Sequence, residues 1–186
     1  MATYNFSLGV IVLGDVPNLE KSLNIFLSVY KENNIEFTYE IIYEELPEEF
    51  YDKNRNQYIA EKILAWLKQN YGSDYDKILG VTNVDIYVEN TNFVFGVAEL
   101  EGKTALVSCY RLLEIGKKGE AISILRLAKE MIHEIGHTFG LEHCNNRKCV
   151  MSFSNSVYEV DEKDIYFCEN CSIRLANLLY YERTRK

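Results

Sequence analysis

The three histidines of the 186-residue chain all lie between His133 and His143, within the stretch HEIGHTFGLEH. His133 and His137 are four residues apart, so on a helix both rings project from one face, one turn apart. Neutral imidazole nitrogens are good zinc ligands. Gly140 tolerates the left-handed backbone that ends a helix, which lets the chain turn back and offer His143 as a third ligand. The spacing therefore predicts a three-histidine zinc site.

Glu134 follows the first of these histidines and gives the site a possible catalytic function. Three protein ligands leave a fourth position for water, as in catalytic rather than structural zinc sites. Zinc lowers the pKa of such a water to about 7, and an adjacent carboxylate can take its proton. We expect Glu134 to be that base. The alternatives are a chance HExxH pentapeptide, or a non-catalytic zinc module, which would not need the glutamate.

Four of the five cysteines form two short-spaced pairs. Four residues separate Cys144 from Cys149, and Cys168 and Cys171 form a CxxC pair. Two such pairs are typical of a closed, structural four-cysteine zinc site. The alternatives are two disulfides or separate buried thiols, but a reducing compartment disfavours disulfides. Cys109, in an apolar stretch, is expected to be an ordinary buried thiol.

The complete pattern resembles known families. His133-Glu134-x-x-His137-x-x-Gly140-x-x-His143 is similar to the metzincin signature, and the cysteines that follow make the chain resemble the archaemetzincins, a group of zinc metallopeptidases. This resemblance implies a catalytic zinc on the three histidines, Glu134 as base and a second zinc on the four cysteines.

The resemblance also concerns the turn after the third histidine. Met151 is placed to form the methionine turn that metzincins carry beneath the zinc. Some metzincin relatives have a tyrosine two residues after this methionine, which can reach the metal. Phe153 stands there in this chain and has no hydroxyl, so we expect no tyrosine ligand from this turn.

The periodicity upstream predicts the elements that must position these residues. Alternating or continuous apolar stretches predict five strands, at residues 4–13, 35–43, 77–82, 92–98 and 104–110. Apolar residues at helical spacing predict four helices, at residues 18–33, 55–71, 119–139 and 168–184. We expect the apolar side of the third helix, from Ile122 and Leu125 to Phe139, to face the core, and its histidines to lie off that side. The order predicts an α+β (mixed α/β), metzincin-like fold with a twisted, mixed five-stranded sheet.

We expect one catalytic domain, residues 1–186, with two lobes. The N-terminal lobe, about 1–140, ends in the histidine helix, and the small C-terminal lobe, about 141–186, ends in a final helix. Residues 141–167 have no sustained periodicity, so the lobe needs another source of order. His143 and Cys144 are consecutive. A zinc on the cysteines would therefore also hold the third histidine and Met151 in place.

Composition limits the range of functions. The formal net charge of -8 disfavours nucleic-acid binding, and no apolar run is long enough to span a bilayer. The first apolar run is interpreted as a strand rather than a signal peptide, which predicts a cytoplasmic location, and we expect a monomer. Zinc, water and an adjacent glutamate fit the hydrolysis of an amide bond. The predicted substrate is a peptide or protein, and a non-peptide amide is the alternative. The strand at residues 92–98 could pair with an extended substrate or be a plain edge strand.

Overall fold

The computed structural model describes residues 2–184. Met1, Arg185 and Lys186 lie outside the described residues. The five predicted strands form one sheet in the order β2-β1-β5-β8-β7. Their bounds are Ile35–Glu44 (β2), Tyr4–Leu13 (β1), Lys77–Thr82 (β5), Thr104–Ser108 (β8) and Gly96–Ala98 (β7). The first four strands are parallel and β7 is antiparallel to β8, which confirms the predicted mixed sheet.

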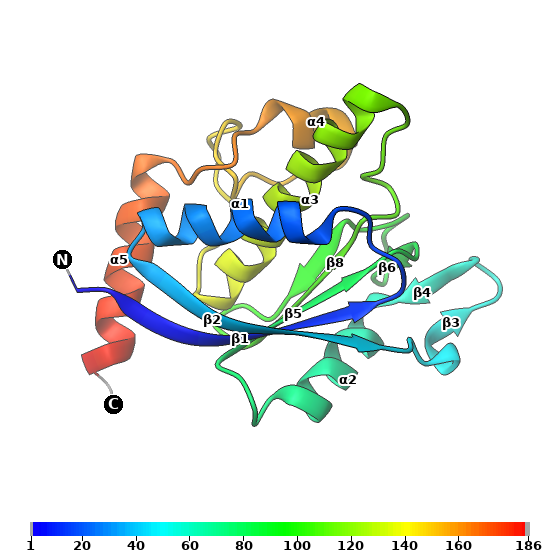
Figure 1. Ribbon diagram of the computed structural model, residues 1–186, viewed down its shortest axis with the longest axis horizontal. Coiled ribbons are helices and arrows are strands. Elements are labelled where there is room, and N and C mark those ends of the chain that lie inside the picture. Colours follow the sequence, from blue (N-terminus) through cyan, green and yellow to red (C-terminus); the bar gives the residue numbers. More distant parts are fainter. Residues whose placement is uncertain (1, 185–186) are drawn as a thin grey trace.

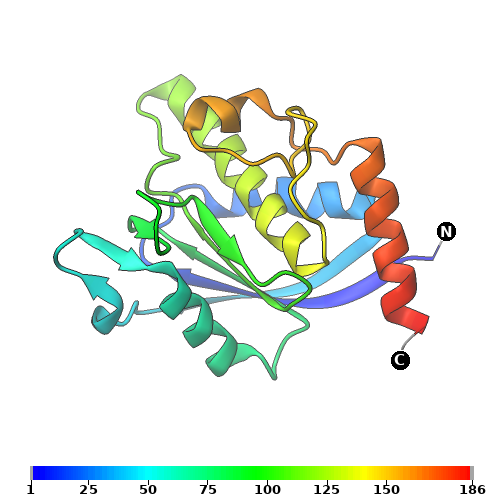
Figure 2. The same cartoon turned by 180° about the vertical axis from the view of Figure 1, so that it is seen from behind.

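Helices cover both faces of this sheet (Figures 1 and 2). Helices α1 (Leu19–Glu32) and α3 (Lys117–Thr138) lie on one face, and α2 (Ala60–Tyr71) lies on the other. In β1, Val10 and Val12 belong to the core beside α1 and α3, whereas Ile11 and Leu13 belong to the core beside α2. A strand with two buried faces needs apolar residues at successive positions, which explains its continuous apolar run.

A second, three-stranded sheet was not predicted. It has the order β3-β4-β6, with bounds Tyr51–Asp52, Gln57–Ile59 and Ile86–Tyr87, and follows the 3-10 turn Glu48–Phe50. The prediction that the second helix begins at Arg55 is therefore wrong, because residues 57–59 pair as a strand and α2 begins at Ala60. The predicted strand at residues 92–98 is also shorter, since only Gly96–Ala98 forms β7.

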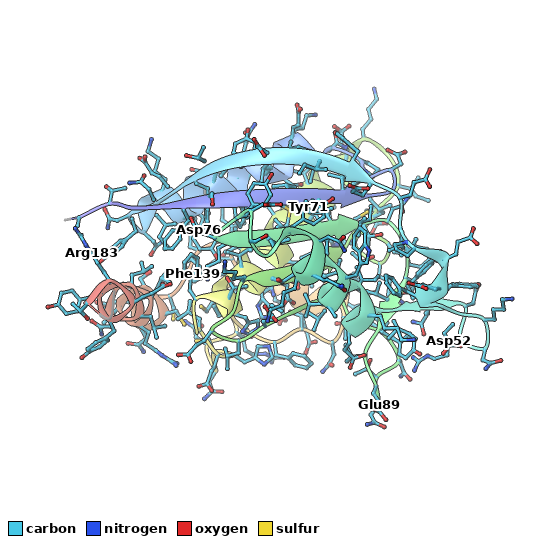
Figure 3. The ribbon with its side chains drawn as sticks, turned by 90° about the horizontal axis from the view of Figure 1, so that it is seen from below. Asp52, Tyr71, Asp76, Glu89, Phe139 and Arg183 are labelled. Atoms are coloured by element: carbon cyan, nitrogen blue, oxygen red, sulfur yellow. The ribbon has the colours of Figure 1, made fainter. Side chains whose placement is uncertain are left out.

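The C-terminal segment packs against the sheet domain through the same core. It contains the unpredicted helix α4 (Val157–Glu162) and the predicted final helix α5 (Glu169–Thr184). Met151, Leu175 and Leu179 are buried in the core cluster that also contains α1 and α3 residues. Figure 3 shows α5, with Arg183, at the end of the molecule opposite Asp52 and Glu89. Among the described residues, no helix is long and apolar enough to cross a membrane.

Helix α3 is buried more completely than its periodicity predicts. Residues 126–136 are all buried, including charged ones. By contrast, Ile122 and Leu125, which were expected to face the core, are exposed. The helix is more buried than predicted because α1 and the sheet cover one side of α3 and the C-terminal segment covers the polar side as well. The polar stripe of α3, which includes Arg126, Lys129 and Glu130, therefore faces the C-terminal lobe rather than solvent.

Candidate active site

Helix α3 ends where the sequence predicted. Gly140 has φ +101°, and the N–H groups of Gly140 and Glu101 both donate to the His137 carbonyl oxygen. The buried ammonium of Lys77 donates to the Thr138 carbonyl oxygen at 2.9 Å. A cation at this position satisfies a terminal carbonyl and complements the negative end of the helix dipole. These contacts fix the turn that leads to His143.

Each histidine on α3 is oriented by a backbone carbonyl from the segment after the helix. His133 Nδ1 lies 2.8 Å from the Val150 oxygen, and His137 Nδ1 lies 2.6 Å from the Leu141 oxygen. A carbonyl can only accept, so both Nδ1 atoms carry the proton and both Nε2 atoms keep a lone pair. The two Nε2 atoms are 3.1 Å apart, close to the separation of about 3.3 Å for two ligands at 2.0 Å from a tetrahedral zinc.

His143 completes the group from outside the helix. Its ring centroid lies 5.3 Å from that of His133 and 4.8 Å from that of His137, and one ligand nitrogen from each histidine lies within 4.8 Å of the others. The exposed ring of Phe153 packs against His143, with centroids 5.1 Å apart. The structure therefore brings the three predicted histidines together, and an apolar ring occupies the position where some relatives carry tyrosine.

The surroundings favour the uncharged form of all three imidazoles. Burial lowers the pKa of His137 to about 4, and burial, together with the Lys163 ammonium, lowers the pKa of His133 and of His143. Neutral imidazole is the form that binds zinc. The group is thus ready to bind a cation at neutral pH without first losing protons.

Met151 lies directly beneath the histidine helix. Its side chain is fully buried, and its sulfur approaches Gly136 so closely that a Cβ at that position would lie 2.6 Å from it. The Met151 carbonyl accepts from the Cys144 N–H at 2.9 Å. The methionine turn and the segment that carries the third histidine are therefore directly bonded to each other.

The four predicted cysteines also converge. All are free thiols, with their sulfur atoms within 4.8 Å of one another, and Cys144 Sγ lies 3.7 Å from Cys168 Sγ. A disulfide needs about 2.05 Å, whereas two thiolates 2.3 Å from a tetrahedral zinc are about 3.8 Å apart. The geometry therefore favours the metal interpretation over disulfides. Cys109 is buried away from this group, as expected.

Backbone donors surround these sulfurs. The N–H groups of Met151 and Cys168 both point at Cys149 Sγ, at 3.4 and 3.3 Å. Burial nevertheless raises the pKa of Cys149 to about 11 and raises the pKa of Cys171 further. Four clustered thiols cannot all ionise unless a cation balances their charge. A zinc ion would supply that charge.

The histidine group opens into a cleft of about 820 Å³, a typical size for a ligand site. One wall is the segment from Val88 to Ala98, which includes β7, and the opposite wall includes Phe153. Glu134 lies between them. A Cβ on Gly96 would be 2.7 Å from Glu134 Cγ, so glycine lets β7 approach the glutamate.

Two buried charged residues beside this site were not predicted. Glu130 lines the cleft, and its Oε1 lies 2.8 Å from the Nζ of Lys163, which is fully buried. Glu130 is four residues before Glu134 on α3, so helical spacing could have identified it. Lys163 lies in a stretch without periodicity, so no signal in the sequence marked it.

Comparison with known proteins identifies the family. The sequence model of peptidase family M54 matches residues 3–177. The chain belongs to peptidase family M54. The archaemetzincin of Methanopyrus kandleri is 47% identical over 127 residues, which cover 68% of this chain and 70% of the relative. The archaemetzincin of Haloquadratum walsbyi is 44% identical over 133 residues, which cover 68% of this chain and 76% of the relative. The resemblance to archaemetzincins is therefore confirmed, and the chain is a zinc metallopeptidase.

Solved structures agree with this M54 assignment. The archaemetzincin crystal structure from M. kandleri has a TM-score of 0.87 and 38% identity, and the match covers 95% of this chain and 96% of that one. A zinc-dependent peptidase from Methanocorpusculum labreanum has a TM-score of 0.76 and 29% identity, with 90% and 99% covered. The predicted fold class is thereby confirmed.

The contact between Gly136 and Met151 is open to a direct test. In Gly136→Ala, the added methyl should displace Met151. The overpacking cost of about 1–3 kcal/mol should exceed the gain in helix propensity of about 1 kcal/mol. Chemical denaturation should show a lower midpoint. In a Met151→Ala background the same change should stabilise the chain, because the sulfur is gone. An equal loss in both backgrounds would contradict this packing.

Proposed function

We propose that this M54 peptidase hydrolyses peptide bonds by a metzincin-type mechanism, with zinc held by His133, His137 and His143 and with Glu134 as general base. The observation that carries the proposal is the convergence of the three imidazoles beside a buried glutamate in one cleft. The donor set supports this proposal, because three neutral imidazoles, two of them with Nδ1 protons fixed by backbone carbonyls, match a zinc site with one open position.

Glu134 has the properties of a proton carrier. Its side chain is buried, and burial, together with the nearby Glu130 carboxylate, raises its pKa well above the usual value. When bound, zinc supplies a Lewis acid that polarises a carbonyl and acidifies water. Glu134 accepts a proton from the attacking water as the water oxygen bonds to the carbonyl carbon. It then delivers that proton to the nitrogen as the C–N bond breaks.

Strand β7 is suited to hold an extended substrate beside these groups. It is the last strand of the sheet, and the adjoining residues 88–95 continue along the cleft. An extended peptide can add to a sheet edge through main-chain hydrogen bonds. Since Gly96 contacts Glu134, a peptide paired with this edge would have its main chain next to the base.

We further propose that Cys144, Cys149, Cys168 and Cys171 bind a second, structural zinc. The support is their sulfur separation and their backbone N–H donors. Residues 144–151 are shared by the two sites, so this metal would also fix His143 and Met151. A single catalytic domain, a monomeric state and a cytoplasmic location stay predictions.

Metal content tests the two-zinc assignment. We expect two zinc ions per chain in protein purified without added zinc. The histidine site should lose its metal first to a chelator, because it opens into the cleft and has no thiolate ligands. Elemental analysis with a thiol-reactive reporter can separate the two losses. A maximum of one zinc per chain after resupply would refute the four-cysteine site.

The cysteine site should organise the C-terminal lobe. Cys149→Ser should lose one zinc and the hydrogen-exchange protection of residues 141–171, because structural zinc binding is folding free energy. Strands β1 and β5 should stay protected, since the core on their other face, beside α2, contains none of the four cysteines. Cys109→Ser, which changes the remaining thiol, is the matched control and should keep both metals. Unchanged protection of residues 141–171 in Cys149→Ser would show that something else orders them.

Glu134→Gln should keep the fold and both metals but lose hydrolysis. Glutamine has nearly the same size but cannot accept the proton, and general-base catalysis contributes about 10²–10⁴-fold. The loss should be at or above the upper end, because the same group also serves the leaving nitrogen. A peptide-library digest of both proteins, with metal analysis, makes the comparison. Parental rates in Glu134→Gln would rule out this mechanism.

A further inference from the structure

Glu130 has a position in the cleft that the mechanism does not use. It lies on α3 one turn before Glu134, about 5.4 Å along the helix axis, and it lines the same cleft. Its side chain is only 4% exposed. A substrate side chain that flanks the bond at Glu134 would therefore lie within reach of the Glu130 carboxylate.

Acidic side chains contribute to the lining of the cleft, and the cations that pair with Glu130 and Glu142 lie outside that lining. Glu130, Glu134 and Glu142 line it, and no lysine or arginine does among the residues described there. Glu134 is assigned to proton transfer. Glu142 is exposed and lies 3.6 Å from Arg174. Glu130 is thus the buried carboxylate that remains for the substrate. The rest of the wall is largely apolar, with Val88, Val94, Phe95, Val97, Leu100 and Phe153.

The ion pair with Lys163 leaves part of Glu130 unused. The Nζ of Lys163 lies 2.8 Å from Oε1 in a geometry that forms no hydrogen bond, and it also donates to the Ser152 carbonyl oxygen at 3.3 Å. Lys163 itself does not line the cleft. Within residues 2–184, Oε2 of Glu130 has no hydrogen-bond partner either. A nearly buried carboxylate with unfilled acceptor positions is costly, so a donor from the cleft would be favoured.

We propose that Glu130 determines specificity by binding a lysine or arginine side chain of the substrate, next to the scissile bond. This rests on the proposed peptidase function. The cation would donate to Oε2 from the cleft, while Lys163 holds Oε1 from the opposite side. The aliphatic part of a lysine or arginine side chain suits the apolar walls, and its charged end suits the carboxylate.

Peptide binding to a variant that cannot turn over tests this directly. The zinc-loaded Glu134→Gln protein is titrated with fluorescent peptides of uncharged, largely apolar sequence, in which one lysine is moved from position to position. A peptide with glutamine at the same position is the reference. In one register, lysine should bind about tenfold more tightly than glutamine, as a charge-assisted hydrogen bond in a partly desolvated site allows. Both peptides are acetylated at the amino terminus.

Variants assign the preference to Glu130. Adding Glu130→Gln should abolish the lysine preference. Because that change leaves Lys163 buried without its partner, the triple variant that also carries Lys163→Met removes the pair together and should show the same loss. Glu120→Gln is the matched control. It removes the same charge from an exposed position on α3, paired with Lys21, and should keep the preference.

Several results would overturn the assignment. These are equal binding of lysine and glutamine peptides in every register, a preference that survives Glu130→Gln, a preference that appears only with a free amino terminus, or no binding at all. Failure of the proposed function can be distinguished from failure of this inference. If the parental chain cleaves no peptide, and lysine peptides still bind through Glu130, hydrolysis fails and the cation site stands. If the parental chain cleaves peptides without a lysine preference, hydrolysis stands and this inference fails.

Discussion

The hydrogen bond between His133 Nδ1 and the Val150 carbonyl, 2.8 Å long, is the contact on which the rest of the site depends. It fixes the tautomer of the first histidine and turns its Nε2 toward the Nε2 of His137. Val150 lies between Cys149, from the sulfur group, and Met151, which packs beneath α3. One main-chain carbonyl therefore joins the two candidate metal sites to the methionine turn. Any movement of this segment would change all three.

Much of this arrangement could be read from sequence because its elements have local signals. The strands of the main sheet, the helix that carries His133 and His137, and the turn at Gly140 each follow from periodicity or from a backbone requirement of one residue. The fixed spacing of the histidines and cysteines supplied the ligand sets. The small sheet was missed because its strands have only two or three residues, too few for a period to be detected.

Other features could not be predicted because they depend on tertiary contacts between distant segments. Ile122 and Leu125 continue the apolar side of α3 but lie beyond the part that the sheet covers, so they are exposed. The partner of Glu130 is Lys163, 33 residues later in a segment without regular pattern. Nothing local to either residue encodes that pair. Long-range charge pairs are selected by the packing of whole elements, which single-sequence periodicity does not describe.

The polar stripe of α3 combines charges that dock the C-terminal lobe with carboxylates that line the cleft. Arg126 forms two hydrogen bonds with Asp161, at 2.8 and 2.7 Å, and Lys129 donates to the Val160 carbonyl at 3.0 Å. Glu130 faces Lys163. Within the part of the chain that the structure describes, Glu134 alone among these buried charges has no protein counter-charge or hydrogen-bond donor in contact. Burying an unpaired carboxylate is costly, and such a residue is a candidate for function because nothing in the fold requires it. The same stripe that docks the C-terminal lobe thus leaves Glu134 without a counter-charge, at the position where it faces the three imidazoles and the cleft.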